Sequence, residues 1–152
     1  MLAACAAGLP KPQVVPQLQA DGGWFQLEQR DAEGHVVQSS LLAVEQSAGE
    51  MRFVQTDALG APLSRQVVGK KGWRNDGFVM PNAAARRLFS AMLPLLAVDS
   101  SKVYPELERK SESGGECYFQ RGEALWCAEK ADKGWLIRFP DQTQWSVLPI
   151  QE

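Results

Sequence analysis

Glycine-containing turns divide the first half of the chain into short apolar runs, and this spacing constrains the fold more than any other feature. Turns are expected at 31–34, 47–49, 57–60 and 70–72. Short strands about 8–12 residues apart with glycine in each turn are typical of an antiparallel meander. We therefore expect five strands, at 24–30, 35–46, 50–56, 63–69 and 73–79. The alternative for the last of them is a second turn at 75–77.

The apolar period changes to that of a helix after residue 80. Asn82 is a suitable N-cap, and apolar residues between 85 and 92 fall at positions i, i+3, i+4 and i+7. Pro94 should end or kink this helix because it lacks a backbone N–H. A second short helix is expected at 103–107, and a polar loop at 108–115.

Four more apolar runs follow, around Cys117, around Trp126, at Trp135–Phe139 and at Gln144–Leu148, and they predict a second meander. A helix lying across the open face of a curved sheet would let both elements bury their apolar sides. The predicted fold class is α+β: a curved antiparallel sheet (a half-barrel) of about nine strands, covered by one or two helices. Residues 21–152 are predicted to form a single domain.

The start of the chain resembles a bacterial lipobox, because Leu-Ala-Ala precedes Cys5. Small residues before a cysteine suit the processing peptidase, and the thiol would carry the lipid. Residues 1–20 then read as lipobox and Pro-rich tether, with the rest of a signal peptide expected upstream of Met1. Ala6 in place of aspartate implies sorting to the outer membrane. The alternative is a chance Leu-Ala-Ala-Cys in an alanine-rich stretch.

The two other cysteines flank a turn centred on Gly122. A hairpin there places Cys117 opposite Cys127, within disulfide reach. Two buried free thiols and a two-cysteine metal site remain as alternatives, although zinc would need further ligands and the single histidine, His35, is distant in sequence. The same hairpin pairs Tyr118 with Trp126 and Phe119 with Leu125.

The composition excludes several functional classes. A net charge of −2 gives no general electrostatic reason to bind nucleic acid. The chain shows no nucleophile motif and no phosphate loop, so it is predicted not to be an enzyme and to need no cofactor or metal. Asp31 and Asp57 are expected to bond backbone amides in turns, with His35 at the surface. The basic doublets Arg86–Arg87 and Lys70–Lys71 read as solvated faces, or as contacts with lipid headgroups or an acidic partner.

These features together resemble the LolA/LolB superfamily of periplasmic lipoprotein carriers and receptors. More narrowly, they resemble LolB-like lipoproteins often encoded in aryl-polyene-type gene clusters. The resemblance covers most of residues 20–150 and lies in the residue pattern and the order of the elements. It is carried by the Cys5 lipobox, Leu41–Glu45, Met51–Val54 leading to Leu59–Leu63, Leu88–Pro94, Trp135–Phe139 and Trp145.

The resemblance implies a half-barrel whose hydrophobic cavity accepts acyl chains. Such a cavity needs a concave wall of large apolar groups, although aromatic residues at strand and helix spacing also form filled cores. The residues expected at this wall are Phe53, Phe78, Phe89, Met92, Leu93, Trp126, Trp135 and Phe139.

The expected function is that of an outer-membrane lipoprotein facing the periplasm, which binds a lipid, an acyl chain or a lipidated client for transport or insertion. Its expected partners are that acyl chain, the inner leaflet of the outer membrane through the lipid on Cys5, and a periplasmic carrier protein, with no nucleic acid. The alternative is a scaffold lipoprotein with a filled core that binds envelope proteins. An enzyme acting on a lipid would instead need polar groups clustered in the cavity.

Overall fold

The computed structural model describes residues 8–15, 17–18, 22–112 and 114–150, and within them it holds ten strands, one α-helix and one short 3-10 helix. The first five strands are β1 (Gly22–Arg30), β2 (Val36–Ser47), β3 (Glu50–Thr56), β4 (Pro62–Gly69) and β5 (Gly72–Asn75). The helices α1 (Ala83–Leu96) and η1 (Ser100–Lys102) come next. The last five strands are β6 (Glu108–Glu112), β7 (Gly115–Gln120), β8 (Glu123–Lys130), β9 (Trp135–Arg138) and β10 (Gln144–Ile150).

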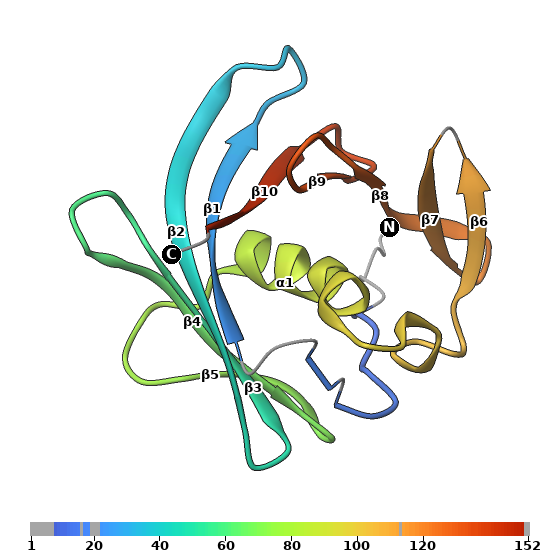
Figure 1. The fold of residues 1–152 in the computed structure, drawn as a ribbon, viewed down its shortest axis with the longest axis horizontal. Coiled ribbons are helices and arrows are strands. Elements are labelled where there is room, and N and C mark those ends of the chain that lie inside the picture. The colour runs from blue at the N-terminus through green and yellow to red at the C-terminus, as the bar shows by residue number, and fades with distance from the viewer. Residues whose placement is uncertain (1–7, 16, 19–21, 113, 151–152) are drawn as a thin grey trace, which may run out of the picture.

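All ten strands form one antiparallel sheet in the order β5-β4-β3-β2-β1-β10-β9-β8-β7-β6. Within each meander, consecutive strands are neighbours. The two meanders are joined by β1 and β10, whose pairing runs from Trp24 with Ile150 to Arg30 with Gln144. The sheet curves around α1, which lies on its concave side (Figure 1). The predicted α+β fold, a curved antiparallel sheet covered by a helix, is therefore confirmed.

The one strand that was not predicted, β6, lies where a polar loop was expected. Its five residues are all exposed, and they pair with β7 from Glu108 opposite Phe119 to Glu112 opposite Gly115. The prediction was wrong because an edge strand with two solvated faces has no apolar residue to mark it. Charged side chains on such an edge also oppose pairing with another chain.

The fifth strand is shorter than predicted. It ends at Asn75, and Gly77 follows in a left-handed conformation with φ of 80°. A turn therefore follows the strand, as in the alternative reading, but it lies at 77–78 and Asn75 still belongs to the strand. The positive φ breaks the extended backbone, and glycine adopts it at little cost.

The helix α1 begins where the sequence predicted, because the Asn82 side chain accepts a hydrogen bond from the Ala85 amide at 3.0 Å. It does not end at Pro94 but continues to Leu96. Pro94 has no N–H for the carbonyl of Ser90, and the Tyr104 hydroxyl donates to that oxygen instead, at 2.8 Å. The tyrosine thus satisfies the carbonyl that the proline leaves unpaired.

The segment after α1 differs from the prediction. The helix expected at 103–107 is absent from this described segment, which instead forms a single turn closed by a hydrogen bond from the Leu107 amide to the Tyr104 carbonyl. The short helix η1 lies just before it. Asp99 caps η1 by accepting hydrogen bonds from the Ser101 amide and hydroxyl. The helix prediction was therefore wrong in position.

The core lies between the concave face of the sheet and α1. Side chains at alternate strand positions point to one face, and the buried apolar ones of β1–β4 form one cluster with those of the later strands and the helix. This cluster includes Phe25, Leu27, Leu42, Val44, Met51, Phe53, Val68, Leu88, Phe89, Met92, Leu93, Tyr118, Trp126, Ile137, Trp145 and Val147.

The predicted disulfide between Cys117 and Cys127 is present, with Cα atoms 4.0 Å apart on directly opposed residues. Tyr118 pairs with Trp126, also as predicted. Phe119, however, pairs with Ala124 and not with Leu125, because the register shifts between residues 118 and 119.

The N-terminal segment expected to be an extended tether lies against the domain in its described part. The Gln13 amide donates to the Val103 carbonyl at 2.9 Å, and Leu18 forms a bridge with Ala97. The Leu18 amide also donates to the Gln46 side chain of β2 at 3.0 Å. Cys5 lies outside the described residues. Among the described residues, no helix combines the length and apolar content that crossing a membrane requires.

Candidate functional site

Six of the eight side chains predicted to line a cavity are buried between the sheet and α1. The fold brings them together from β3, from α1, from β8 and from the residue after β9, and none is more than 3% exposed. They are Phe53, Phe89, Met92, Leu93, Trp126 and Phe139. Their role as lipid contacts stays a prediction.

These interior side chains pack on one another. The ring of Phe53 in β3 stacks on that of Phe89 in α1, with centroids 4.7 Å apart and an angle of 17° between the planes. Trp73 in β5 closes the group at 5.5 Å from Phe53. Trp126 contacts the ring of Tyr104 edge-on and that of Tyr118 at a tilt, with centroids 5.8 and 5.2 Å away. Protein side chains therefore fill the space beneath the middle of the helix, as expected for a packed core.

The other two predicted residues lie elsewhere. Phe78 is fully exposed, because β5 ends at Asn75 and the alternation of a strand no longer directs its side chain inward. Its placement at the interior wall was wrong. Trp135 in β9 packs against the core but remains partly exposed, with the Lys130 ammonium 5.1 Å from its ring centroid.

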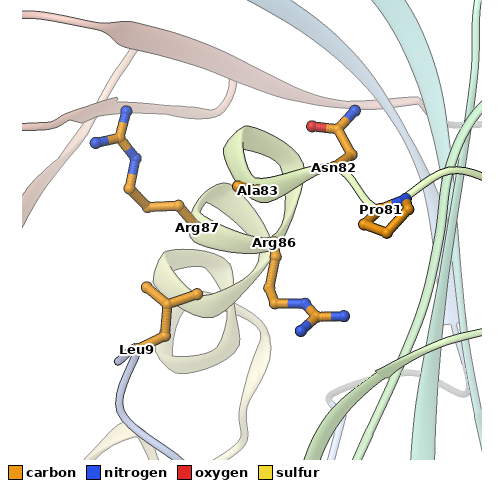
Figure 2. A pocket seen from close by; sticks show the side chains of 6 residues that line it. All are labelled: Leu9, Pro81, Asn82, Ala83, Arg86 and Arg87. Carbon is orange, nitrogen blue, oxygen red and sulfur yellow. The ribbon is translucent and has the colours of Figure 1, made fainter. Parts of the chain in front are cut away.

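A pocket of about 320 Å³ lies at the start of α1. This volume is at the lower end of the range of about 300–1,000 Å³ typical of ligand sites. Much of its wall is apolar, from ring, methyl and methylene groups. Figure 2 shows the six lining residues, which come from the segment before α1, its first two turns and the N-terminal segment: Leu9, Pro81, Asn82, Ala83, Arg86 and Arg87.

Arg86 is held at this pocket by neutral oxygen atoms. Its Nε and Nη2 donate to the Gln66 Oε1 at 2.9 and 2.6 Å, and Nη2 also donates to the Asn75 Oδ1 at 3.0 Å. The side chain is half-buried, and this burial lowers the pKa of Arg86 below its ordinary value. A partly desolvated cation therefore stands next to apolar surface.

Arg87 is held differently. It forms an ion pair with Asp141 at 2.9 Å, and its guanidinium lies 4.1 Å from the centroid of the Phe139 ring. This residue links α1 to the loop between β9 and β10, and its charge is neutralised by the protein itself.

A row of buried polar side chains crosses the concave face beside Arg86. Gln66 is 1% exposed, and its Nε2 donates to the Ser64 hydroxyl at 3.1 Å, which directs Oε1 toward the arginine. On the neighbouring strands, the Gln55 Nε2 donates to the Ser40 hydroxyl at 2.9 Å. The Gln55 Oε1 is buried without a hydrogen-bond partner. The concave surface is thus polar at the end where the pocket lies, and aromatic beneath the middle of α1.

The loop between β5 and α1 presents two large apolar side chains to solvent. Phe78 and Met80 are 107% and 78% exposed, and the chain then runs into Pro81 at the pocket. Backbone and side-chain hydrogen bonds fix the loop against β4 at both ends, from Asp76 to the Arg65 carbonyl and from Asn82 to that of Leu63. Their position beside the pocket makes this loop a candidate contact surface.

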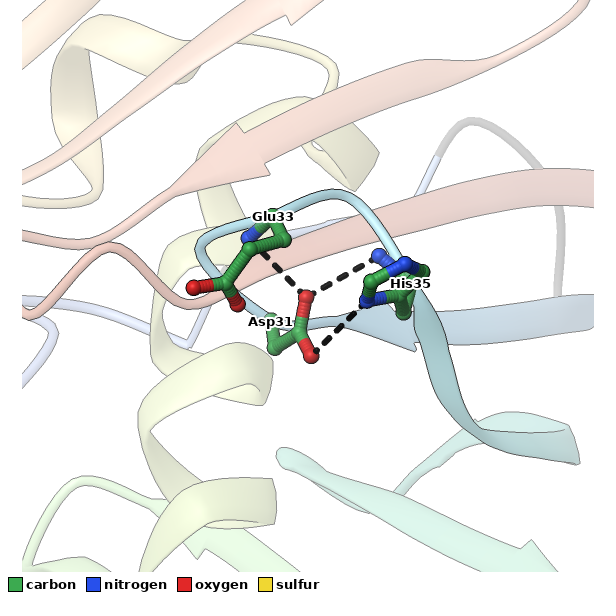
Figure 3. A group of neighbouring side chains, drawn as sticks. All are labelled: Asp31, Glu33 and His35. Atoms are coloured by element: carbon green, nitrogen blue, oxygen red, sulfur yellow. Dashed lines mark hydrogen bonds and ion pairs between the residues drawn. The ribbon is translucent and has the colours of Figure 1, made fainter.

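A group of three titratable side chains lies in the turn between β1 and β2 (Figure 3). The Asp31 Oδ1 accepts hydrogen bonds from the amides of Glu33 and His35, each at 3.0 Å, and Oδ2 lies 3.6 Å from the His35 Nδ1. Closing the turn therefore accounts for this group. The expectations that Asp31 bonds backbone amides and that His35 is exposed are confirmed.

The pocket at the start of α1 lies outside the interior wall that the sequence predicted as the binding site. Among the pocket residues outside the helix, Asn82 was predicted as the N-cap, whereas Leu9 and Pro81 were not predicted, because only the tertiary structure brings them together. Two signals in the sequence mark this region, the basic doublet at Arg86–Arg87 and the polar Gln66 at an inward-facing strand position.

No protein-family model matches this chain, and no curated protein matches it in sequence.

Proposed function

We propose that the protein is an outer-membrane lipoprotein that faces the periplasm and binds a lipid, an acyl chain or a lipidated client at the start of α1. The observation that carries this proposal is the partly apolar pocket. Its lining residue Pro81 directly follows the loop that holds the exposed Phe78 and Met80. Each methylene removed from water contributes about 0.8 kcal/mol, so a few carbons in the pocket supply useful affinity.

The place of the proposed anchor is consistent with this function. Leu9 lines the pocket, and Cys5 precedes it by only four residues in the sequence. A lipid on Cys5 would therefore hold the pocket close to the leaflet from which it takes a hydrocarbon chain or to which it delivers one.

Binding is tested with purified protein and a fluorescent fatty acid. We expect saturable binding to the wild type, and about tenfold weaker binding to Ala83→Trp, whose side chain would fill the pocket. The matched control is Ala84→Trp, because Ala84 is exposed in the same turn but does not line the pocket. This variant should bind the fatty acid like the wild type. Absence of saturable binding to the wild type, or equal loss in both variants, would contradict the proposal.

The anchor is tested separately in cells. Expression with an upstream secretion signal and radioactive palmitate should label the wild type and leave Cys5→Ser unlabelled. Label retained in Cys5→Ser would show that Cys5 is not the acceptor.

A scaffold lipoprotein that binds envelope proteins is the second candidate, and the packed interior beneath α1 favours it. It predicts that protein from membranes carries a specific protein partner and no lipid by native mass spectrometry. The lipid-binding proposal predicts copurified lipid, lost in Ala83→Trp.

A further inference from the structure

Arg86 differs in its partners from seven of the eight other arginines in the described part of the chain. Among the described residues, it forms no ion pair with a carboxylate, and no hydrogen bond engages its Nη1. Seven other arginines each form an ion pair with Asp or Glu: Arg30, Arg52, Arg65, Arg74, Arg87, Arg109 and Arg138. The charge of Arg86 is therefore available to a ligand.

The protein also holds this guanidinium in a fixed place. Gln66 is fully enclosed and oriented by Ser64, so the two bonds from Arg86 to its Oε1 anchor the side chain from one side. Anchoring reduces the rotamer entropy that an arginine would lose on binding. The neutral partners orient the cation without cancelling its charge.

The start of the helix adds a second positive feature. α1 has 14 residues and no acidic side chain in its first turn. The Asn82 side chain accepts from the Ala85 amide, while Ala83, at the pocket, is the first helical residue. The N-terminal end of a helix carries a partial positive charge from its unpaired amides. Both features act on the same pocket, where partial burial strengthens electrostatic attraction.

We infer that the pocket selects anionic lipids, with Arg86 binding the carboxylate or phosphate while the apolar wall holds the adjoining hydrocarbon. The inference rests on the proposed lipid binding and adds the class of headgroup. Arg86 acts here as a specificity residue.

The test compares a fluorescent fatty acid with its uncharged methyl ester at neutral pH. We expect the wild type to bind the acid about tenfold more tightly, the magnitude of one hydrogen bond to a charged group. Arg86→Gln should lose most of this preference, because only the attraction of the helix N-terminus remains, and its affinity for the ester should be unchanged. Arg86→Lys should keep more of the preference than Arg86→Gln. Arg30→Gln removes an arginine that pairs with Glu28 and should retain the full preference.

The outcomes separate the two proposals. Binding of neither probe to the wild type overturns the proposed function itself. Binding of both without preference, or an undiminished preference in a folded Arg86→Gln, overturns only the role of Arg86. Thermal unfolding of each variant shows that it is folded.

Competition distinguishes a lipid headgroup from a free anion. Vesicles containing phosphatidylglycerol should displace the bound acid from the wild type more effectively than vesicles of phosphatidylcholine alone. Inorganic phosphate at millimolar concentration should not displace it, because phosphate gains nothing from the apolar wall. Displacement by phosphate as effective as by the anionic vesicles would show a simple anion site and overturn the inference.

Discussion

Pro94 and Tyr104 show how one residue compensates for another within this fold. The proline removes the amide that would bond the Ser90 carbonyl, and the buried Tyr104 hydroxyl replaces it. Burial also raises the pKa of Tyr104 far above its ordinary value, so the phenol remains protonated and able to donate. The proline can therefore remain inside α1.

Replacing Tyr104 with Phe should leave a buried carbonyl without a partner. We expect Tyr104→Phe to lower the free energy of unfolding by about 1–3 kcal/mol. The effect should shrink in a Pro94→Ala background, where the alanine amide can bond the Ser90 carbonyl. Chemical denaturation of the four proteins in this cycle measures both effects. An equal cost in the two backgrounds would show that the hydroxyl does not compensate for the proline.

At the scale of elements, the β7–β8 hairpin combines a disulfide with a two-residue turn. Arg121 and Gly122 both have positive φ, at 53° and 83°, as in the turns whose twist matches that of paired strands. The bulge after Tyr118 then shifts the register, while Tyr118 and Trp126 stay opposed on the core side. The disulfide lies on the other face, so it fastens the hairpin without interrupting the core.

Removing both cysteines should destabilise the domain without changing the candidate site. A disulfide closing so short a loop contributes about 2–3 kcal/mol in the chain-entropy model. We expect Cys117→Ala/Cys127→Ala to lose about that much in chemical denaturation and to bind the fatty acid as the wild type does. If the free energy of unfolding were unchanged, the disulfide would have no stabilising role.

The stability of the whole molecule should fall in acid. Several carboxyl groups have pKa values below their ordinary ones. Among them, the pKa of Glu50 is lowered because Arg74 donates to it, that of Asp31 because the His35 amide does, and that of Asp99 because the Ser101 hydroxyl does. A lowered pKa in the folded state means that the unfolded chain binds more protons, so stability is full above the ordinary pKa and is lost as pH falls below it.

Urea unfolding between pH 6 and pH 3 tests this expectation. The midpoint should be nearly constant above pH 5, fall steadily below about pH 4, and fall less in Glu50→Gln, which has no charge to lose. A midpoint that is constant or rises toward pH 3 would show that these carboxylates do not stabilise the fold.

Most of the architecture could be predicted from local patterns. Glycine turns and alternating apolar residues located nine of the strands, because a strand with one buried face must alternate and a tight reversal favours glycine. The same logic could not find β6, which has no buried face. It also misplaced Phe78, since the length of β5 depends on its pairing with β4.

The candidate site could be predicted only in part. The sequence determined the helix, its cap, the hairpin that aligns Cys117 with Cys127, and the basic doublet at Arg86–Arg87, because each depends on neighbours a few residues apart. Only the tertiary structure decided that aromatic side chains fill the centre and that Leu9 and Pro81 meet at the start of α1. Those outcomes depend on how distant surfaces pack, and no local spacing encodes the volume that remains between them.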